Sequence, residues 1–231
     1  MTMATAGEGQ GAIGEDYYRA NYQDYERQTS AAKLRFYLEL VGRWVPQGAS
    51  LFELGVGLGH FLEAAAAHYD VAGSEINLYG VQQARARVPR ARVSEGSFEV
   101  IPADGGANAV VSWDVLEHLP DLDAGLAAIH ARLAAGGYLI GVVPVYDGPL
   151  GWLVTMLDHD PTHVSKFGRS EWLRRLERHG FQVVEHGGIL RKLVAGRYVH
   201  LTRPQLVLRA CGSALYFVAW KKDGPPPGSP K

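Results

Sequence analysis

Along the chain, short continuous apolar runs alternate with longer segments in which apolar residues recur every three or four positions. The short runs predict buried strands, and the longer segments predict helices with one apolar face. Strands are expected at residues 50–54, 71–75, 91–95, 109–113, 138–144, 181–185 and 214–220. Helices are expected at residues 17–44, 59–69, 77–88, 121–135 and 170–180.

This alternation is typical of a parallel sheet whose strands are joined by crossover helices. We therefore predict an α/β fold with a doubly wound, mostly parallel sheet. The last two strands have no full helical pattern between them, so one of them is expected to run antiparallel. Ser170 is expected to cap the last long helix, and Gly136 and Gly137 are expected to end the helix over 121–135.

The 231 residues suffice for one domain, which we place at 15–222, between loose tails at 1–14 and 223–231. The net charge of −1 argues against a general nucleic-acid binder. No basic segment precedes an apolar one at the N-terminus, and no apolar run approaches the roughly 18 residues of a spanning helix. With one cysteine, Cys211, an intrachain disulfide or a thiolate metal cluster is excluded. We expect a cytoplasmic protein without membrane contact.

A glycine-rich turn follows the first predicted strand and opens the next helix. It reads Glu53-Leu-Gly55-Val-Gly57-Leu-Gly59. Glycines there allow a tight turn and a close approach of a ligand, and the helix N-terminus offers free amide donors. A dinucleotide-binding turn would place its third glycine at position 60, which is His60.

An acidic residue, Glu75, ends the second predicted strand, 20 residues after Gly55. A carboxylate at this position can accept both ribose hydroxyls of a bound nucleoside. The turn and the acid together therefore predict a site for an adenosine-containing cofactor, and a solvated carboxylate at Glu75 is the structural alternative.

After the fourth predicted strand the chain reads Trp113-Asp114-Val-Leu-Glu117-His118-Leu-Pro120. Together with the spacing of the glycines, this run resembles class I S-adenosylmethionine-dependent methyltransferases. The resemblance covers about 51–145 well and implies a seven-stranded Rossmann-like sheet with a covering N-terminal helix. It also implies S-adenosylmethionine as cofactor and S-adenosylhomocysteine as product. Glu117 is equally explained as a carboxylate that favours a helix start.

The resemblance implies further cofactor contacts. Trp113 and Asp114 are expected near the methionine end of the cofactor, with His118 close by. Where the family often has Gly-Asp for the adenine amine, this chain has Gly96-Ser97-Phe98. Ser97 is expected to donate or accept a hydrogen bond and Phe98 to stack on the ring, and Glu95 or Glu99 is the alternative for the missing acid. The cofactor-binding residues expected in all are Glu53, Gly55, Gly57, Gly59, Glu75, Ile76, Ser97, Phe98, Trp113, Asp114, His118 and, from the covering helix, Tyr25.

The segments 145–170 and 187–212 are expected to cap the acceptor side. The first contains Asp158, His159, Asp160 and His163, which suit a base for an acceptor hydroxyl, hydrogen bonds that order a loop, or a metal site. The spacing matches no established metal motif, so no metal is assigned. We favour His163 as base, with Asp160 to orient it and His159 beside them. The basic residues of 187–212 are expected on a solvated face.

We therefore expect transfer of a methyl group to an oxygen, or a nitrogen, of a small-molecule acceptor. A nicotinamide-dependent oxidoreductase and a non-catalytic S-adenosylmethionine-binding protein are the alternatives. The sequence does not identify the acceptor or the oligomeric state.

Overall fold

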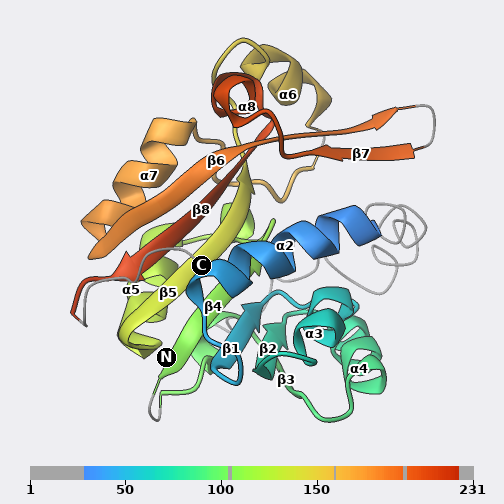
Figure 1. The fold of residues 1–231 in the computed structure, drawn as a ribbon, viewed down its shortest axis with the longest axis vertical. Helices are drawn as coiled ribbons and strands as arrows, with labels where there is room; N and C mark the ends of the chain where they lie inside the picture. Colours follow the sequence, from blue (N-terminus) through green and yellow to red (C-terminus); the bar gives the residue numbers. More distant parts are fainter. Residues whose placement is uncertain (1–28, 104–105, 159, 195–196, 224–231) are drawn as a thin grey trace, which may run out of the picture.

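A computed structural model describes residues 29–103, 106–158, 160–194 and 197–223 (Figure 1). Its eight strands form one sheet in the order β3-β2-β1-β4-β5-β8-β6-β7. The strands are β1 (Ser50–Leu54), β2 (Asp70–Glu75), β3 (Arg92–Glu95), β4 (Ala107–Trp113), β5 (Leu133–Pro144), β6 (Phe181–Val194), β7 (Arg197–Leu201) and β8 (Ala214–Lys221). The helices are α2 (Ala31–Trp44), α3 (His60–Ala65), α4 (Leu78–Arg87), α5 (Leu122–Arg132), α6 (Gly151–Leu157), α7 (Arg169–Arg178) and α8 (Gln205–Cys211), with short 3-10 turns η1 (Phe98–Val100) and η2 (Leu116–His118).

The strand directions confirm the α/β prediction. β1 to β5 are mutually parallel, and β8 lies antiparallel between β5 and β6. Seven of the strands follow the expected arrangement. The eighth strand, β7, was not predicted. Among the described residues it pairs with the C-terminal part of β6, from Leu190 to Val194.

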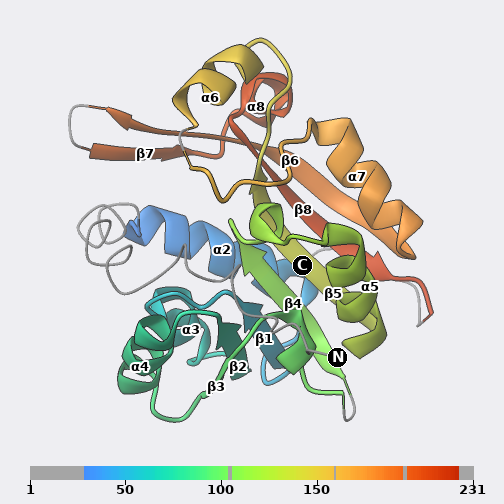
Figure 2. The same cartoon turned by 180° about the vertical axis from the view of Figure 1, so that it is seen from behind.

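Helices cover both faces of the sheet, as a doubly wound fold requires. Figure 1 shows α2 in front of the sheet, whereas Figure 2 shows α5 and α7 on the opposite face. Two buried clusters match these layers. One joins the sheet to α2, α3 and α4 through residues such as Leu40 and Leu62, and the other joins it to α5 and α7 through residues such as Leu126 and Trp172.

Two local predictions were wrong. Helix α5 ends at Arg132, not near 135, because Leu133 turns to extended backbone and pairs with Ala107 as the first residue of β5. Gly136, with φ +73°, lies in the irregular part of β5, where the register shifts, and does not end the helix. Likewise Ser170 does not cap α7.

Helix α7 begins at Arg169, one residue before the expected cap Ser170, and Gly168 is its N-cap residue. The carboxylate of Asp147 takes the capping role from another segment: its Oδ2 accepts a hydrogen bond from the backbone N of Arg169 at 2.7 Å. Asp121, by contrast, caps α5 as a helix-start carboxylate, accepting from the backbone N of Ala124 at 2.9 Å.

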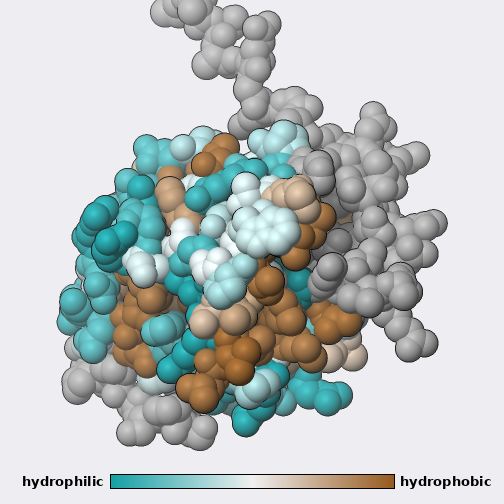
Figure 3. Space-filling model, turned by 90° about the horizontal axis from the view of Figure 1, so that it is seen from above, coloured by the Kyte–Doolittle hydropathy of each residue, from teal (hydrophilic) through white to brown (hydrophobic). Residues whose placement is uncertain are grey.

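The segments expected as caps form α6, α8 and the β6–β7 hairpin at one end of the sheet (Figure 1). Helix α8 packs closely on β6, where the amide side chain of Gln205 bonds to both the N and the O of Gly188 at 3.0 Å. Apolar patches interrupt the hydrophilic surface on the face seen from above (Figure 3). Large exposed apolar residues of α6 and α8 are Trp152, Met156, Leu157, Leu206 and Val207.

In the part of the chain that the structure describes, no helix combines the length and the apolar character needed to cross a membrane. The cytoplasmic location and the division into domain and tails stay predictions.

Candidate functional site

The glycine turn connects β1 to α3 with three left-handed residues. Gly55, Gly57 and Gly59 have φ values of +74°, +52° and +81°. A Cβ at Gly55 would lie 2.4 Å from Cγ2 of Val115, so a larger residue is excluded by space as well as by φ. The backbone N–H groups of Gly55 and Val56 both donate to the carbonyl of Ser74, which ties the turn to the end of β2.

Glu75 lies at that end of β2 and is 5% exposed. Its Oε2 accepts a hydrogen bond from the backbone N of Gly57 at 2.9 Å, and its Oε1 accepts from the N of Asn77 at 3.0 Å. The carboxylate therefore links the glycine turn to the start of α4, which Asn77 caps. Ile76, between the two polar residues, is more than half exposed.

Glu53 places a second buried carboxyl group beside the first. It is 3% exposed, and no described residue hydrogen-bonds to its Oε2. Burial, together with the nearby Glu75, raises the pKa of Glu53 well above its usual range. Burial therefore favours the neutral form of the Glu53 carboxyl group.

The end of β4 packs against α2, and the residue after it is held by two cations. Trp113 stacks on Tyr37 of α2, with ring centroids 4.0 Å apart and an angle of 8° between the planes. Asp114 is left-handed, with φ +60°, and its carboxylate pairs with Arg191 at 2.5 Å and Lys33 at 3.8 Å. Burial alone would raise the pKa of Asp114, but these two cations outweigh it and lower that pKa.

A second polar cluster joins the segment after β5 to the loop before α7. Nδ1 of His163 lies 2.8 Å from Oδ1 of Asp158, and the hydroxyl of Tyr146 donates to Oδ2 of Asp158 at 2.6 Å. Lys166 adds an ion pair to Asp158 at 2.9 Å. Burial opposes ionisation of Asp158, yet the hydrogen bonds from Lys166, Tyr146 and His163 lower its pKa. Burial and Asp158 raise the pKa of Tyr146.

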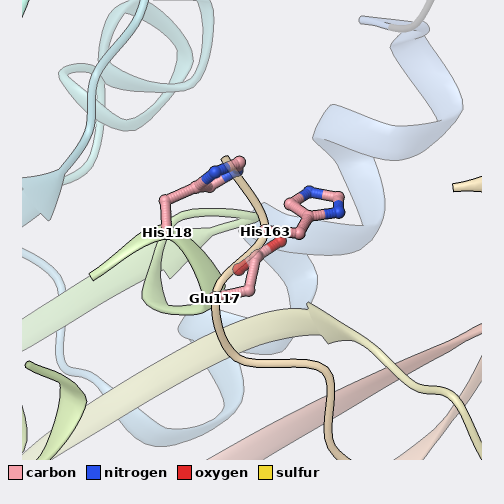
Figure 4. A group of neighbouring side chains, drawn as sticks. All are labelled: Glu117, His118 and His163. Atoms are coloured by element: carbon pink, nitrogen blue, oxygen red, sulfur yellow. The ribbon is translucent and has the colours of Figure 1, made fainter. Parts of the chain in front are cut away.

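His118, in η2, joins this cluster (Figure 4). Its ring centroid lies 4.6 Å from that of His163, and its Nδ1 lies 2.8 Å from Oγ1 of Thr162. Thr162 in turn donates to Oδ1 of Asp160 at 2.5 Å. Burial, with the neighbouring His163, lowers the pKa of His118.

The chain matches a family model described as a methyltransferase domain over residues 24–186, well over half of its length. The chain belongs to this methyltransferase family. As a member, the enzyme uses S-adenosylmethionine as its methyl donor, and the nicotinamide-dependent alternative is set aside. The comparison with curated protein sequences finds no match.

Solved structures agree on the fold of the methyltransferase. A chain of the complex between the Haloferax volcanii Trm112 methyltransferase activator and a methyltransferase has a TM-score of 0.72 and 19% identity, over 91% of this chain and 99% of that one. A protein of Bacillus halodurans C-125 described as a methyltransferase has a TM-score of 0.64 and 16% identity, over 83% and 99%. A geranyl diphosphate methyltransferase, in complex with its substrate and sinefungin, has a TM-score of 0.61 and 17% identity, over 83% and 77%.

The methyltransferase brings together most of the residues expected at the cofactor. The glycine turn, Glu53 and Glu75 meet at the carboxyl ends of β1 and β2. Trp113 ends the neighbouring strand β4, and Asp114 follows it. His118 contacts the loop before α7 through Thr162 and His163, and its place near the cofactor stays a prediction. Tyr25 and His159 lie outside the described residues.

Ser97 and Phe98, the two residues expected at the adenine, differ in their contacts. Phe98 packs partly buried against the core cluster of α5, where Gly125 leaves room for its ring. The backbone N of Ser97 donates to Oε1 of Glu99 at 2.7 Å, whereas no described residue hydrogen-bonds to its hydroxyl group. The stacking role of Phe98 stays a prediction.

Two acceptor-side expectations change. Asp158, rather than the expected Asp160, hydrogen-bonds to His163, because Asp160 is turned toward Thr162 and its Oδ2 lies 4.0 Å from Nε2 of His163. Arg191 was expected on a solvated face, but it is largely buried and pairs with Asp114. Sequence reasoning had no local signal for that pair, since 77 residues separate its members.

His200 makes the stability of the methyltransferase dependent on pH. The ring packs near Phe36 and Tyr37, at centroid distances of 5.7 and 5.9 Å. Burial, followed by the charges of Lys33 and Arg191, lowers the pKa of His200 to about 4. The folded state therefore keeps the ring neutral. The contribution of His200 to the free energy of unfolding is complete above the unfolded-state pKa of about 6.5, and it is lost as the pH falls toward 4.

We expect the wild type to lose roughly 1–2 kcal/mol more free energy of unfolding than His200→Gln between pH 7 and pH 4.5, after allowing for solvent screening of a half-buried group. Urea unfolding followed by circular dichroism at each pH measures the difference. Parallel pH profiles for the two proteins would contradict this role of His200.

Proposed function

We propose that the enzyme methylates an oxygen of a small-molecule acceptor that binds between the segment after β4 and the loop residues 160–166. When bound, S-adenosylmethionine supplies an electrophilic methyl group on its sulfonium sulfur. The chain's own task is then to hold donor and acceptor in line and to accept the proton that the acceptor loses.

The residues at the ends of β1 and β2 fit the adenosine part of this cofactor. The glycine turn leaves a ligand free of Cβ clashes, Glu75 offers two carboxylate oxygens to ribose hydroxyls, and the buried Oε2 of Glu53 has no described partner. We assign Gly55, Gly57, Gly59 and Glu75 to holding the nucleoside. The adenine contacts of Ser97 and Phe98 and the role of Tyr25 stay predictions.

Trp113 and Asp114 would face the methionine end. Their position is rigid, because Tyr37 stacks on Trp113 while Lys33 and Arg191 hold Asp114. The indole Nε1 of Trp113 is buried and has no described hydrogen-bond partner. That donor supports a polar ligand group beside it.

The observation that supports an oxygen acceptor is the hydrogen bond between His163 and Asp158. The two residues after His163 are hydrogen-bonded to the backbone of Glu117, in the segment after β4. A hydroxyl must lose its proton on methylation, and an imidazole oriented by a carboxylate suits that proton transfer. The pair lies next to His118, so the acceptor would meet imidazole groups from two elements.

To test the acceptor class, the enzyme is incubated with S-adenosylmethionine and a panel of hydroxylated small molecules, each matched by the amine of the same skeleton. We expect S-adenosylhomocysteine and a methyl ether from at least one hydroxyl compound, and no product from its amine. Glu75→Gln serves as the control for dependence on the cofactor site. Products from amines alone, or methylation confined to protein or RNA, would overturn the proposal.

A further inference from the structure

We propose that Glu117, His118 and His163 bind one divalent transition-metal cation. Each residue offers a ligand atom, and the three atoms lie within 4.8 Å of one another (Figure 4). Ligands at about 2.1 Å from one ion lie within about 4.2 Å of each other, so small side-chain movements complete the site. Glu117 and His118 come from η2, and His163 comes from the loop before α7.

The burial of the Glu117 carboxyl group is the observation that points to a ligand. Its side chain is 1% exposed, and neither carboxylate oxygen has a hydrogen-bond partner among the described residues. An ionised carboxylate is costly to bury without a partner, and a cation between it and the two imidazoles would supply one.

The backbone holds the two parts of the cluster in place. The carbonyl oxygen of Glu117 accepts hydrogen bonds from the backbone N–H groups of Val164 at 3.1 Å and Ser165 at 3.0 Å. The residue that precedes these two is His163. The fold therefore fixes the loop against η2 at the point where the three side chains meet.

Both imidazoles are oriented as metal ligands usually are. Nδ1 of His163 is engaged by the carboxylate of Asp158, and Nδ1 of His118 is engaged by the hydroxyl of Thr162. Thr162 is itself held by Asp160. Outer partners of this kind fix the ring and leave Nε2 for the metal.

One carboxylate and two imidazoles favour Zn²⁺, Mn²⁺, Fe²⁺ or Co²⁺ over Mg²⁺ and Ca²⁺, which prefer oxygen ligands. Three protein ligands leave coordination positions open. Resting on the proposed function, we assign an open position to the acceptor oxygen, where the cation lowers the pKa of the hydroxyl. In the cation-bound enzyme His163 acts as a ligand and not as the base, and the proton of the metal-bound hydroxyl passes to bulk water.

Untagged protein, stripped of metal with a chelator and dialysed, is titrated with Co²⁺ while visible d–d absorption is recorded, and Zn²⁺ is then added as competitor. We expect one Co²⁺ per chain, displaced by Zn²⁺. Glu117→Gln and His163→Asn should each weaken binding more than 100-fold, and Thr162→Val, which removes only the outer partner of His118, about tenfold. His179→Asn is the matched control, because this histidine also pairs with a carboxylate, Asp123, but lies at the end of α7.

Absence of Co²⁺ absorption in the wild type, or equal affinity in wild type and Glu117→Gln, would overturn the site. Thermal melting checks that each variant folds, and Thr162→Val keeps the test decisive if the ligand variants do not. S-adenosylmethionine binding is titrated separately. Its failure would remove the proposed function and leave the cation result standing, whereas failure of cation binding alone would leave the methyltransferase intact.

Discussion

Replacing Glu75 by glutamine is expected to weaken S-adenosylmethionine binding by about 2–4 kcal/mol, a rise in Kd of roughly 30- to 1000-fold. The carboxylate accepts hydrogen bonds from the N of Gly57 and the N of Asn77, so it shapes the glycine turn, and we propose that its oxygens also accept the ribose hydroxyls. A glutamine amide keeps the shape but replaces one acceptor by a donor. Isothermal titration calorimetry measures both affinities.

Glu177→Gln is the control. Glu177 is an exposed carboxylate of α7 and belongs to neither the cofactor site nor the acceptor side. Its substitution should leave the Kd for S-adenosylmethionine unchanged. Equal losses of affinity in the two variants, or none in Glu75→Gln, would contradict the assignment of Glu75 to the ribose.

Replacing Asp114 by asparagine is expected to lower the free energy of unfolding by about 2–3 kcal/mol. Asparagine tolerates the left-handed backbone at this position, so the substitution removes the charge and keeps the conformation. Arg191 and Lys33, whose side chains are 17% and 14% exposed, would then lose their shared counter-ion. Chemical denaturation gives the change in free energy.

Asp123→Asn tests whether this effect depends on burial. Asp123 also pairs with an arginine, Arg175, at 2.8 Å, but its side chain is 57% exposed. Because solvent screens exposed ion pairs, the loss should be much smaller than at Asp114. The double variant Asp114→Asn with Arg191→Met should recover part of the loss. If Asp123→Asn lowered the free energy of unfolding as much as Asp114→Asn, the result would contradict a role for burial in the strength of the Asp114 ion pairs.

Local patterns predicted the cofactor side of the fold well. β1 was expected at its observed bounds, and the glycine turn lies where the alternation of strand and helix placed it. The order of the parallel strands then brings Glu75 to the turn, because the carboxyl ends of adjacent parallel strands share one edge. Short-range spacing sufficed here because strand, turn and helix are consecutive in the chain.

The acceptor side could not be predicted in the same way. Leu133 continues the helical spacing of α5 but is buried as the first residue of a strand, so periodicity placed the helix end too late. Polar residues interrupt the apolar pattern of 187–212, so the sequence did not predict the extension of β6 to Val194 or the helix α8. Asp114 meets Arg191, and Glu117 meets His163, only through tertiary packing.

The central claim is that the glycine turn and Glu75 form the site for S-adenosylmethionine. Calorimetric titration of S-adenosylmethionine into the purified wild-type protein tests it most directly, with reduced nicotinamide cofactor as the competing ligand. We predict saturable binding of one S-adenosylmethionine per chain with a micromolar Kd, and no binding of the nicotinamide cofactor. A well-folded protein that binds no S-adenosylmethionine, with or without acceptor present, would contradict the account.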